Sequence, residues 1–131
     1  MRFSRKIIIT FIMTLAVTTT VLGSPGTRYQ EYLELMAGNA AMDKVLPFMN
    51  KEMREKLSKA PRALKRLQGM AKYQIGAGSV VSGESIDGEN ATVEMTPVKE
   101  QNGRMTYIKI EMIKENDQWV ILRPIYSNTP Q

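Results

Sequence analysis

The chain has 131 residues, among them 18 lysines and arginines and 13 aspartates and glutamates, but no cysteine and no histidine. The absence of cysteine excludes a disulfide framework and a thioether-linked lipid. The additional absence of histidine excludes the usual zinc ligands and the Ser-His-Asp and Cys-His catalytic groups. We therefore expect a non-enzymatic protein, without a metal or a cofactor, that is held together by packing alone.

The first 23 residues have the layout of a secretory signal peptide. Arg2, Arg5 and Lys6 give a positive start, an uncharged and mostly apolar stretch follows over residues 7–22, and small residues precede a cut after Gly23. The apolar stretch is shorter than the roughly 20 residues of a membrane-spanning helix. We expect export to the bacterial periplasm or the cell exterior, with an uncleaved N-terminal anchor as the alternative.

Residues 24–131 are expected to form one domain, because a chain of this length supports one hydrophobic core but not two. Loss of the three leader cations leaves 15 basic residues (18 − 3) against 13 acidic residues, a net charge of +2. This nearly neutral charge argues against dedicated nucleic-acid binding. No later segment is apolar over a sufficient length, so we expect no integral membrane span after cleavage.

The first half of this domain has helical patterns. Thr27 is expected to cap a helix that begins at Arg28 and ends at Gly38-Asn39 in a left-handed C-cap. A short second helix should end or kink at Pro47, since proline disrupts a helix interior.

Asn50 is expected to cap the next helical segment. Apolar residues then recur at alternating steps of four and three, which indicates one stripe along a helix: Met53, Leu57, Ala60, Leu64, Leu67 and Ala71. Pro61 interrupts the stripe without shifting its phase. The pattern therefore predicts two helices, near residues 51–59 and 61–72.

The second half has β-rich runs separated by turn residues. Four strands are predicted, at residues 73–84, 90–99, 104–114 and 119–126. Ile108, Ile110 and Met112 alternate with polar residues in the third run, which predicts one buried face. Asn102-Gly103 is the strongest hairpin signal, because both central residues of a type I′ turn need positive φ. Helices followed by an antiparallel meander predict an α+β fold.

Four segments carry a resemblance to a known family: Asp43–Met49 (DKVLPFM), Glu52–Leu57 (EMREKL), Ile86–Val93 (IDGENATV) and Asp117–Ile121 (DQWVI). With the helices before them, they resemble the small exported bacterial domains of the nuclear-transport-factor-2-like, cystatin-like fold, many of which are lipoproteins of unknown function. The resemblance covers about residues 27–125. It implies N-terminal helices packed on a bent four-stranded antiparallel sheet that often encloses a conical pocket. This chain departs from the lipoproteins because it lacks the lipid-bearing cysteine.

Methionine usage gives the strongest indication of binding. Eight of the ten methionines lie beyond residue 23, and methionine suits adaptable apolar pockets as well as flexible cores. We expect a pocket between the helices and the sheet that binds a small apolar or amphipathic ligand. Its candidate lining residues are Tyr32, Met36, Met53, Met95 and Trp119.

Two alternatives remain from the sequence. The first is a module that binds an envelope protein or forms a homodimer through the exposed sheet face around Tyr107 and Ile113. The second is an isomerase of the ketosteroid type, in which Asp43 would be paired with Tyr29 or Tyr32. No motif assigns these catalytic roles, so no catalytic residue is predicted.

Overall fold

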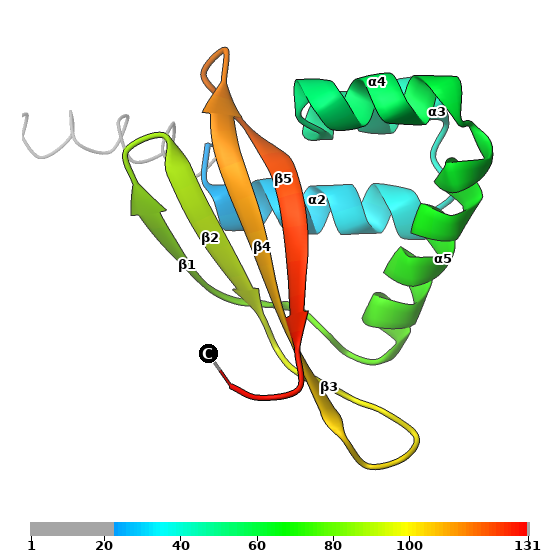
Figure 1. Ribbon diagram of the computed structural model, residues 1–131, viewed down its shortest axis with the longest axis vertical. Helices are drawn as coiled ribbons and strands as arrows, with labels where there is room; N and C mark the ends of the chain where they lie inside the picture. Colours follow the sequence, from blue (N-terminus) through cyan, green and yellow to red (C-terminus); the bar gives the residue numbers. More distant parts are fainter. Residues whose placement is uncertain (1–22, 131) are drawn as a thin grey trace, which may run out of the picture.

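The computed structural model describes residues 23–130 and has an α+β fold, with the helices first and an antiparallel sheet after them (Figure 1). The predicted signal peptide lies outside the described residues, except for Gly23. The helical half comprises α2 (Pro25–Ala37), α3 (Met42–Val45), the 3-10 turn η1 (Leu46–Phe48), α4 (Lys51–Lys59) and α5 (Arg62–Gly76). The strands are β1 (Val81–Asp87), β2 (Asn90–Met95), β3 (Val98–Lys99), β4 (Met105–Glu115) and β5 (Gln118–Ser127).

Helix α2 begins three residues earlier than the sequence predicts. Ser24, not Thr27, is the N-cap, and its side-chain oxygen accepts a hydrogen bond of 3.1 Å from the Thr27 N–H. Pro25 fits the first turn because a helix leaves that N–H without an internal partner. At the other end Gly38 has φ −86°, and Asn39 takes the left-handed conformation with φ 59°.

Helix α5 is longer than predicted. Asn50 caps α4 as expected, since its Oδ1 accepts the Met53 N–H at 3.0 Å. α5, however, continues to Gly76, and β1 begins only at Val81, so the prediction of a strand from Tyr73 was wrong for its first eight residues. The helix continues there because Gln74 extends the buried stripe through Ala71 by one further step of three.

The sheet is an antiparallel meander of five strands rather than four. β1 pairs with β2, β2 with β4, and β4 with β5, while β3 pairs with the start of β4. The predicted second strand is broken at Thr96-Pro97, because proline has no N–H to donate to a partner strand. Thr96 instead binds the loop after α5: its N–H donates to the Val80 carbonyl oxygen at 2.8 Å, and its Oγ1 accepts the Val80 N–H at 2.9 Å.

The hairpin turn after β4 lies where the sequence predicts a turn, but the type I′ geometry occurs there and not at Asn102-Gly103. Asn116 and Asp117 both have positive φ, 50° and 63°, so the type I′ geometry lies between β4 and β5. At the predicted position only Gly103 has positive φ, 85°, and its N–H donates to the Glu100 carbonyl oxygen at 2.9 Å. The Glu100 N–H also donates to the Arg104 carbonyl oxygen at 2.7 Å, so residues 101–103 form a three-residue loop with a left-handed glycine rather than a type I′ turn.

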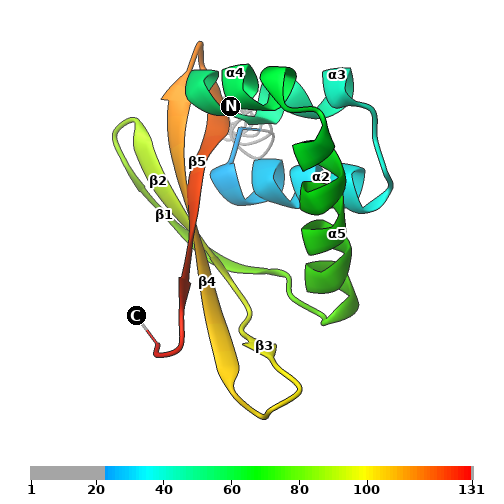
Figure 2. The same ribbon diagram turned by 45° about the vertical axis from the view of Figure 1, so that its right-hand side comes forward.

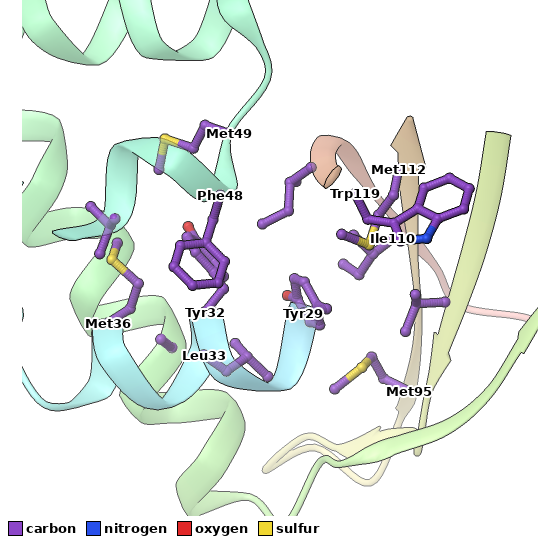
Figure 3. Packing of buried hydrophobic residues seen from close by; sticks show 14 of the residues in the cluster. Tyr29, Tyr32, Leu33, Met36, Phe48, Met49, Met95, Ile110, Met112 and Trp119 are labelled. Atoms are coloured by element: carbon purple, nitrogen blue, oxygen red, sulfur yellow. The ribbon is translucent and has the colours of Figure 1, made fainter. Parts of the chain in front are cut away.

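The core lies between the helices and one face of the sheet (Figures 2 and 3). The predicted inward face of β4 is confirmed: Ile108, Ile110 and Met112 are at most 4% exposed. Leu33 and Met36 of α2 pack against this face in one continuous hydrophobic cluster. Burial of such side chains stabilises the fold by roughly 1.5–3 kcal/mol each.

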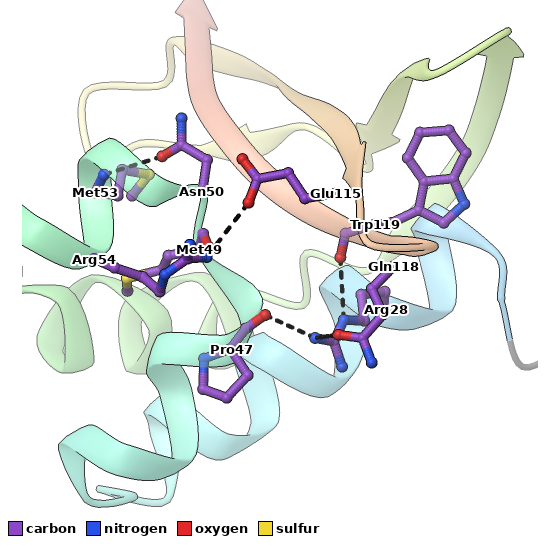
Figure 4. A network of polar contacts seen from close by, with 9 residues as sticks. All are labelled: Arg28, Pro47, Met49, Asn50, Met53, Arg54, Glu115, Gln118 and Trp119. Carbon is purple, nitrogen blue, oxygen red and sulfur yellow. Dashed lines mark hydrogen bonds and ion pairs between the residues drawn. The ribbon is translucent and has the colours of Figure 1, made fainter.

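Polar contacts join the helices to the start of β5 (Figure 4). The Arg28 guanidinium donates to the Trp119 carbonyl oxygen at 3.1 Å and to the Pro47 carbonyl oxygen at 2.8 Å, and it stacks 3.9 Å over the Phe48 ring. Burial lowers the pKa of Arg28, and nearby Glu31 partly offsets this effect. Arg28 thereby connects α2 with η1 and β5 at one end of the sheet.

Candidate functional site

The structure places most of the predicted pocket residues in the closed core. Met36, Met95 and Trp119 are at most 4% exposed and belong to the main hydrophobic cluster. Tyr32 and the half-buried Met53 line an inner cavity of about 60 Å³ between the helices and the sheet. This volume is far below the roughly 300–1,000 Å³ of small-molecule pockets, so it is too small for an organic ligand. Assignment of a ligand pocket to these five residues stays a prediction.

A groove of about 440 Å³ lies next to this inner cavity, between the last turns of α5 and the β3–β4 end of the sheet. We call it the α5 groove. Its helix wall consists of Arg66, Gly69, Met70, Tyr73 and Gln74. Its sheet wall consists of Val98, Glu100, Thr106, Ile108 and Tyr126. Two other hollows, of about 570 and 580 Å³, are more open to solvent and have more polar linings.

The path of α5 creates the groove. α5 packs mainly against α2 and crosses its C-terminal end, after which it runs down beside the sheet (Figures 1 and 2). α2 fills the space between the sheet and the first part of α5. Beyond α2, no helix of residues 23–130 lies between the last turns of α5 and the lower part of β4. Because the prediction replaced the last turn of α5 by a strand, it could not anticipate this cavity.

The walls of the groove are joined at its rim. The Glu100 carboxylate, on the sheet wall, accepts hydrogen bonds from the Tyr73 hydroxyl at 2.7 Å and from Thr106 Oγ1 at 2.9 Å. These two bonds lower the pKa of Glu100, and the bond to Glu100 raises the pKa of Tyr73. The Tyr73–Glu100 contact is thus a polar link from α5 to the loop after β3.

Three residues line both the α5 groove and the inner cavity: Met70, Gln74 and Tyr126. Gln74 is only 8% exposed, and its Nε2 has no hydrogen-bond partner within residues 23–130. Tyr29 stands behind it, and burial raises the pKa of this tyrosine strongly, while the Gln74 amide acts in the opposite direction. A buried amide therefore separates the groove from the core.

The acid–base pair of the isomerase hypothesis is not assembled. Asp43 is exposed on α3 and lines neither the α5 groove nor the inner cavity, whereas Tyr29 and Tyr32 are buried. Within the described part of the chain, no cluster of three or more acidic side chains could hold a metal ion. Between Gly23 and Pro130, no helix combines the length and the hydrophobicity of a membrane span.

The predicted interaction face lies on the side of β4 that points away from the helices. Tyr107 and Ile113 are half-buried there, near opposite ends of the strand. Between them, Lys109 lies 3.9 Å from Glu94 and Glu111 lies 2.6 Å from Arg123, so charged cross-strand pairs occupy the centre. The role of Tyr107 and Ile113 in binding a partner stays a prediction.

Comparisons of the chain with protein-family models, with curated proteins and with solved structures found no match.

Proposed function

We propose that this protein is an exported, non-enzymatic binding protein that takes a small apolar or amphipathic molecule in the α5 groove. The groove itself is the observation that supports this function. Its volume of about 440 Å³ lies within the roughly 300–1,000 Å³ of small-molecule pockets, and carbon atoms make up most of its lining. Large side chains at its mouth, Met70, Tyr73 and Tyr126, are 43–54% exposed, which leaves apolar surface for a ligand to cover.

The proposal includes a nuclear-transport-factor-2-like fold and export to the periplasm or cell exterior. Helices that precede an antiparallel meander, and cover one face of it, support the fold. The positive start and apolar stretch of the first 23 residues support export. The exposed position of Asp43 supports a binding role over the isomerase hypothesis, in which this carboxylate would have to lie inside a pocket.

Fluorescence titration with N-phenyl-1-naphthylamine, an uncharged apolar dye, tests the groove. We expect the wild-type protein to bind the dye and Met70→Lys to weaken binding about tenfold or more, because a ligand would then desolvate an ammonium group. Lysine favours helices and position 70 is partly exposed, so the variant should fold.

Ile86→Lys is the matched control, because Ile86 is also exposed, at 54%, but lies on β1 outside the groove. It should bind the dye as the wild type does. Equal affinity of all three proteins would place the dye elsewhere. Failure of the wild-type protein to bind would reject the proposed function.

A further inference from the structure

The outer side of α5 carries four cations, and the helix contains no acidic residue. The four cations are exposed and lie outside the stripe through Leu67 and Ala71 that packs on the core: Arg62, Lys65, Arg66 and Lys72. No side chain of residues 23–130 forms an ion pair with any of them. We call this surface the basic face of α5.

This distribution of charge does not favour the stability of α5. Arg62 and Lys65 lie in the first turn, where the positive end of the helix dipole disfavours cations, and Arg62 repels Arg66 one turn further along. α4 has the opposite arrangement, with Glu52 in its first turn, Lys56 in its last turn, and 3.7 Å between the two charged groups. The basic face is therefore unfavourable for an isolated helix, whereas an anionic partner would offset the repulsion.

The basic face gives the domain a charge polarity. Without its four cations, residues 24–131 have 11 basic residues (15 − 4) against 13 acidic residues, a net charge of −2. α5 runs along one side of the molecule, while the β1–β2 hairpin, with the exposed Asp87 and Glu89 at its turn, lies on the opposite side (Figures 1 and 2). An extended anionic surface would attract α5 and repel the opposite side, which favours a single orientation.

The length and the apolar neighbours of the basic face favour a lipid surface over a single anion. Arg62 and Lys72 are ten residues apart, or about 15 Å along the helix, which suits a row of headgroups better than one phosphate. Met70 and Tyr73 follow Arg66 by one and two turns and are 43% and 54% exposed. Tyrosine is enriched at membrane–water interfaces, where its ring lies at the level of the headgroups.

We propose that the basic face of α5 docks on an anionic phospholipid bilayer, with its four cations against the lipid phosphates and with Met70 and Tyr73 at the level of the headgroups. This docking goes beyond the proposed function, because it needs no ligand in the α5 groove. Met70 and Tyr73 also stand at the mouth of that groove. The docked protein therefore presents the groove to the bilayer, which is itself a source of apolar and amphipathic molecules.

Sedimentation of the exported protein with vesicles measures the docking. We expect binding to vesicles of equal parts phosphatidylglycerol and phosphatidylcholine, no binding to pure phosphatidylcholine, and release in about 1 M NaCl, where the Debye length is about 3 Å. Lys65→Gln/Lys72→Gln should weaken binding about 25-fold, since each cation near an anionic surface contributes about fivefold. Glutamine favours helices about as well as lysine, so the variant should fold without a lower Tm.

Lys51→Gln/Lys114→Gln is the matched control, because it removes the same charge from exposed positions of α4 and β4. Its affinity for the anionic vesicles should stay within about threefold of wild type. Equal weakening by both double variants would overturn the proposal, because net charge rather than α5 would then attract the protein. Equal binding to the two kinds of vesicle would also overturn it.

A soluble polyanion tests the choice of partner. Binding to poly-glutamate without binding to the anionic vesicles would overturn the membrane as the partner and would assign the basic face to an acidic protein. The vesicles contain no dye, and the dye titration contains no vesicles. Loss of docking therefore leaves the function of the groove unaffected, and failure to bind the dye leaves the docking unaffected.

Discussion

At the scale of single residues, Tyr32 shows how burial connects a side chain to stability. Its ring lies in the core, with centroids 5.8 Å from the Tyr29 ring and 6.1 Å from the Phe48 ring. Burial raises the pKa of Tyr32 to about 12, and Tyr126 adds a smaller rise. Ionisation of this hydroxyl would place a negative charge against the apolar inner cavity, where water solvates it poorly.

This shift predicts a loss of stability in alkali. The pKa of Tyr32 in the folded state exceeds the ordinary value of 10. The contribution of Tyr32 to the free energy of unfolding is therefore complete below pH 10 and is lost as the pH rises from 10 through 12. Two pKa steps correspond to about 2–3 kcal/mol of unfolding free energy. Urea unfolding at a series of pH values measures the loss, and Tyr32→Phe should show less of it. If the free energy of unfolding changed identically with pH in the wild type and in Tyr32→Phe, Tyr32 would not be the group responsible for the loss.

At the scale of elements, backbone conformation decides the effect of the same substitution at two glycines. Gly69 lies inside α5 and Gly78 lies in the loop after it, with φ 79°. A Cβ would find open space at both positions. Gly69→Ala should stabilise the protein by about 0.5–1 kcal/mol because alanine favours the helix. Gly78→Ala should destabilise it by about 1–2 kcal/mol because a side chain strains the left-handed conformation.

Thermal or urea unfolding measures both variants. Opposite signs are expected, with a higher midpoint for Gly69→Ala and a lower one for Gly78→Ala. A lower unfolding midpoint for Gly69→Ala would mean that α5 needs a glycine for a reason other than backbone conformation. An unchanged midpoint for Gly78→Ala would mean that the loop adapts to the side chain.

Local sequence patterns correctly predicted the elements whose buried face or first residue is marked by neighbouring residues. The alternation around Ile110 identified the inward face of β4, and the Asn50 cap placed the start of α4. Boundaries set by distant contacts were missed. The end of α5 depends on burial of Gln74. The break after β2 was missed although Pro97 is a local signal for it, and the residue before this proline, Thr96, forms hydrogen bonds with the distant loop at Val80.

The residues that form the walls of the groove were not predictable from the sequence. A pocket between helices and sheet was expected, yet its candidates were chosen from apolar residues of predicted core stripes. Such residues fill the core, as Met36 and Trp119 do. The groove walls instead come from Met70 near the end of the predicted helix, from Tyr73 on a helix turn that was predicted as strand, and from the end of the sheet beside them. One feature of the sequence pointed to the groove: the polar residue Gln74 occupies a position on the buried face of α5.

At the scale of the whole molecule, the two ends of the sheet are attached to the helices in different ways. Near β5's start, Arg28 binds backbone carbonyls of η1 and β5, and the Asn50 N–H donates to the Ile121 carbonyl oxygen at 3.1 Å. At the other end, the last turn of α5 reaches the β3–β4 loop through the Tyr73–Glu100 hydrogen bond across an open groove. Few buried contacts support that end, so it should open with a lower free energy than the core.

Hydrogen exchange should therefore show both this asymmetry and its removal by a ligand. In the free protein, amides of residues 70–76 and of β3 should exchange faster than those of β4 and β5 beside Ile110. N-phenyl-1-naphthylamine at about 100 times its Kd should stabilise the fold by about 2.7 kcal/mol if it binds the folded state alone. A dye in the groove touches both walls, so protection should rise most in residues 70–76 and 98–106, and hardly in the Asp87–Asn90 turn. Uniform protection, or protection centred on that turn, would place the dye outside the groove, because a bound molecule slows local opening only where the open state breaks its contacts.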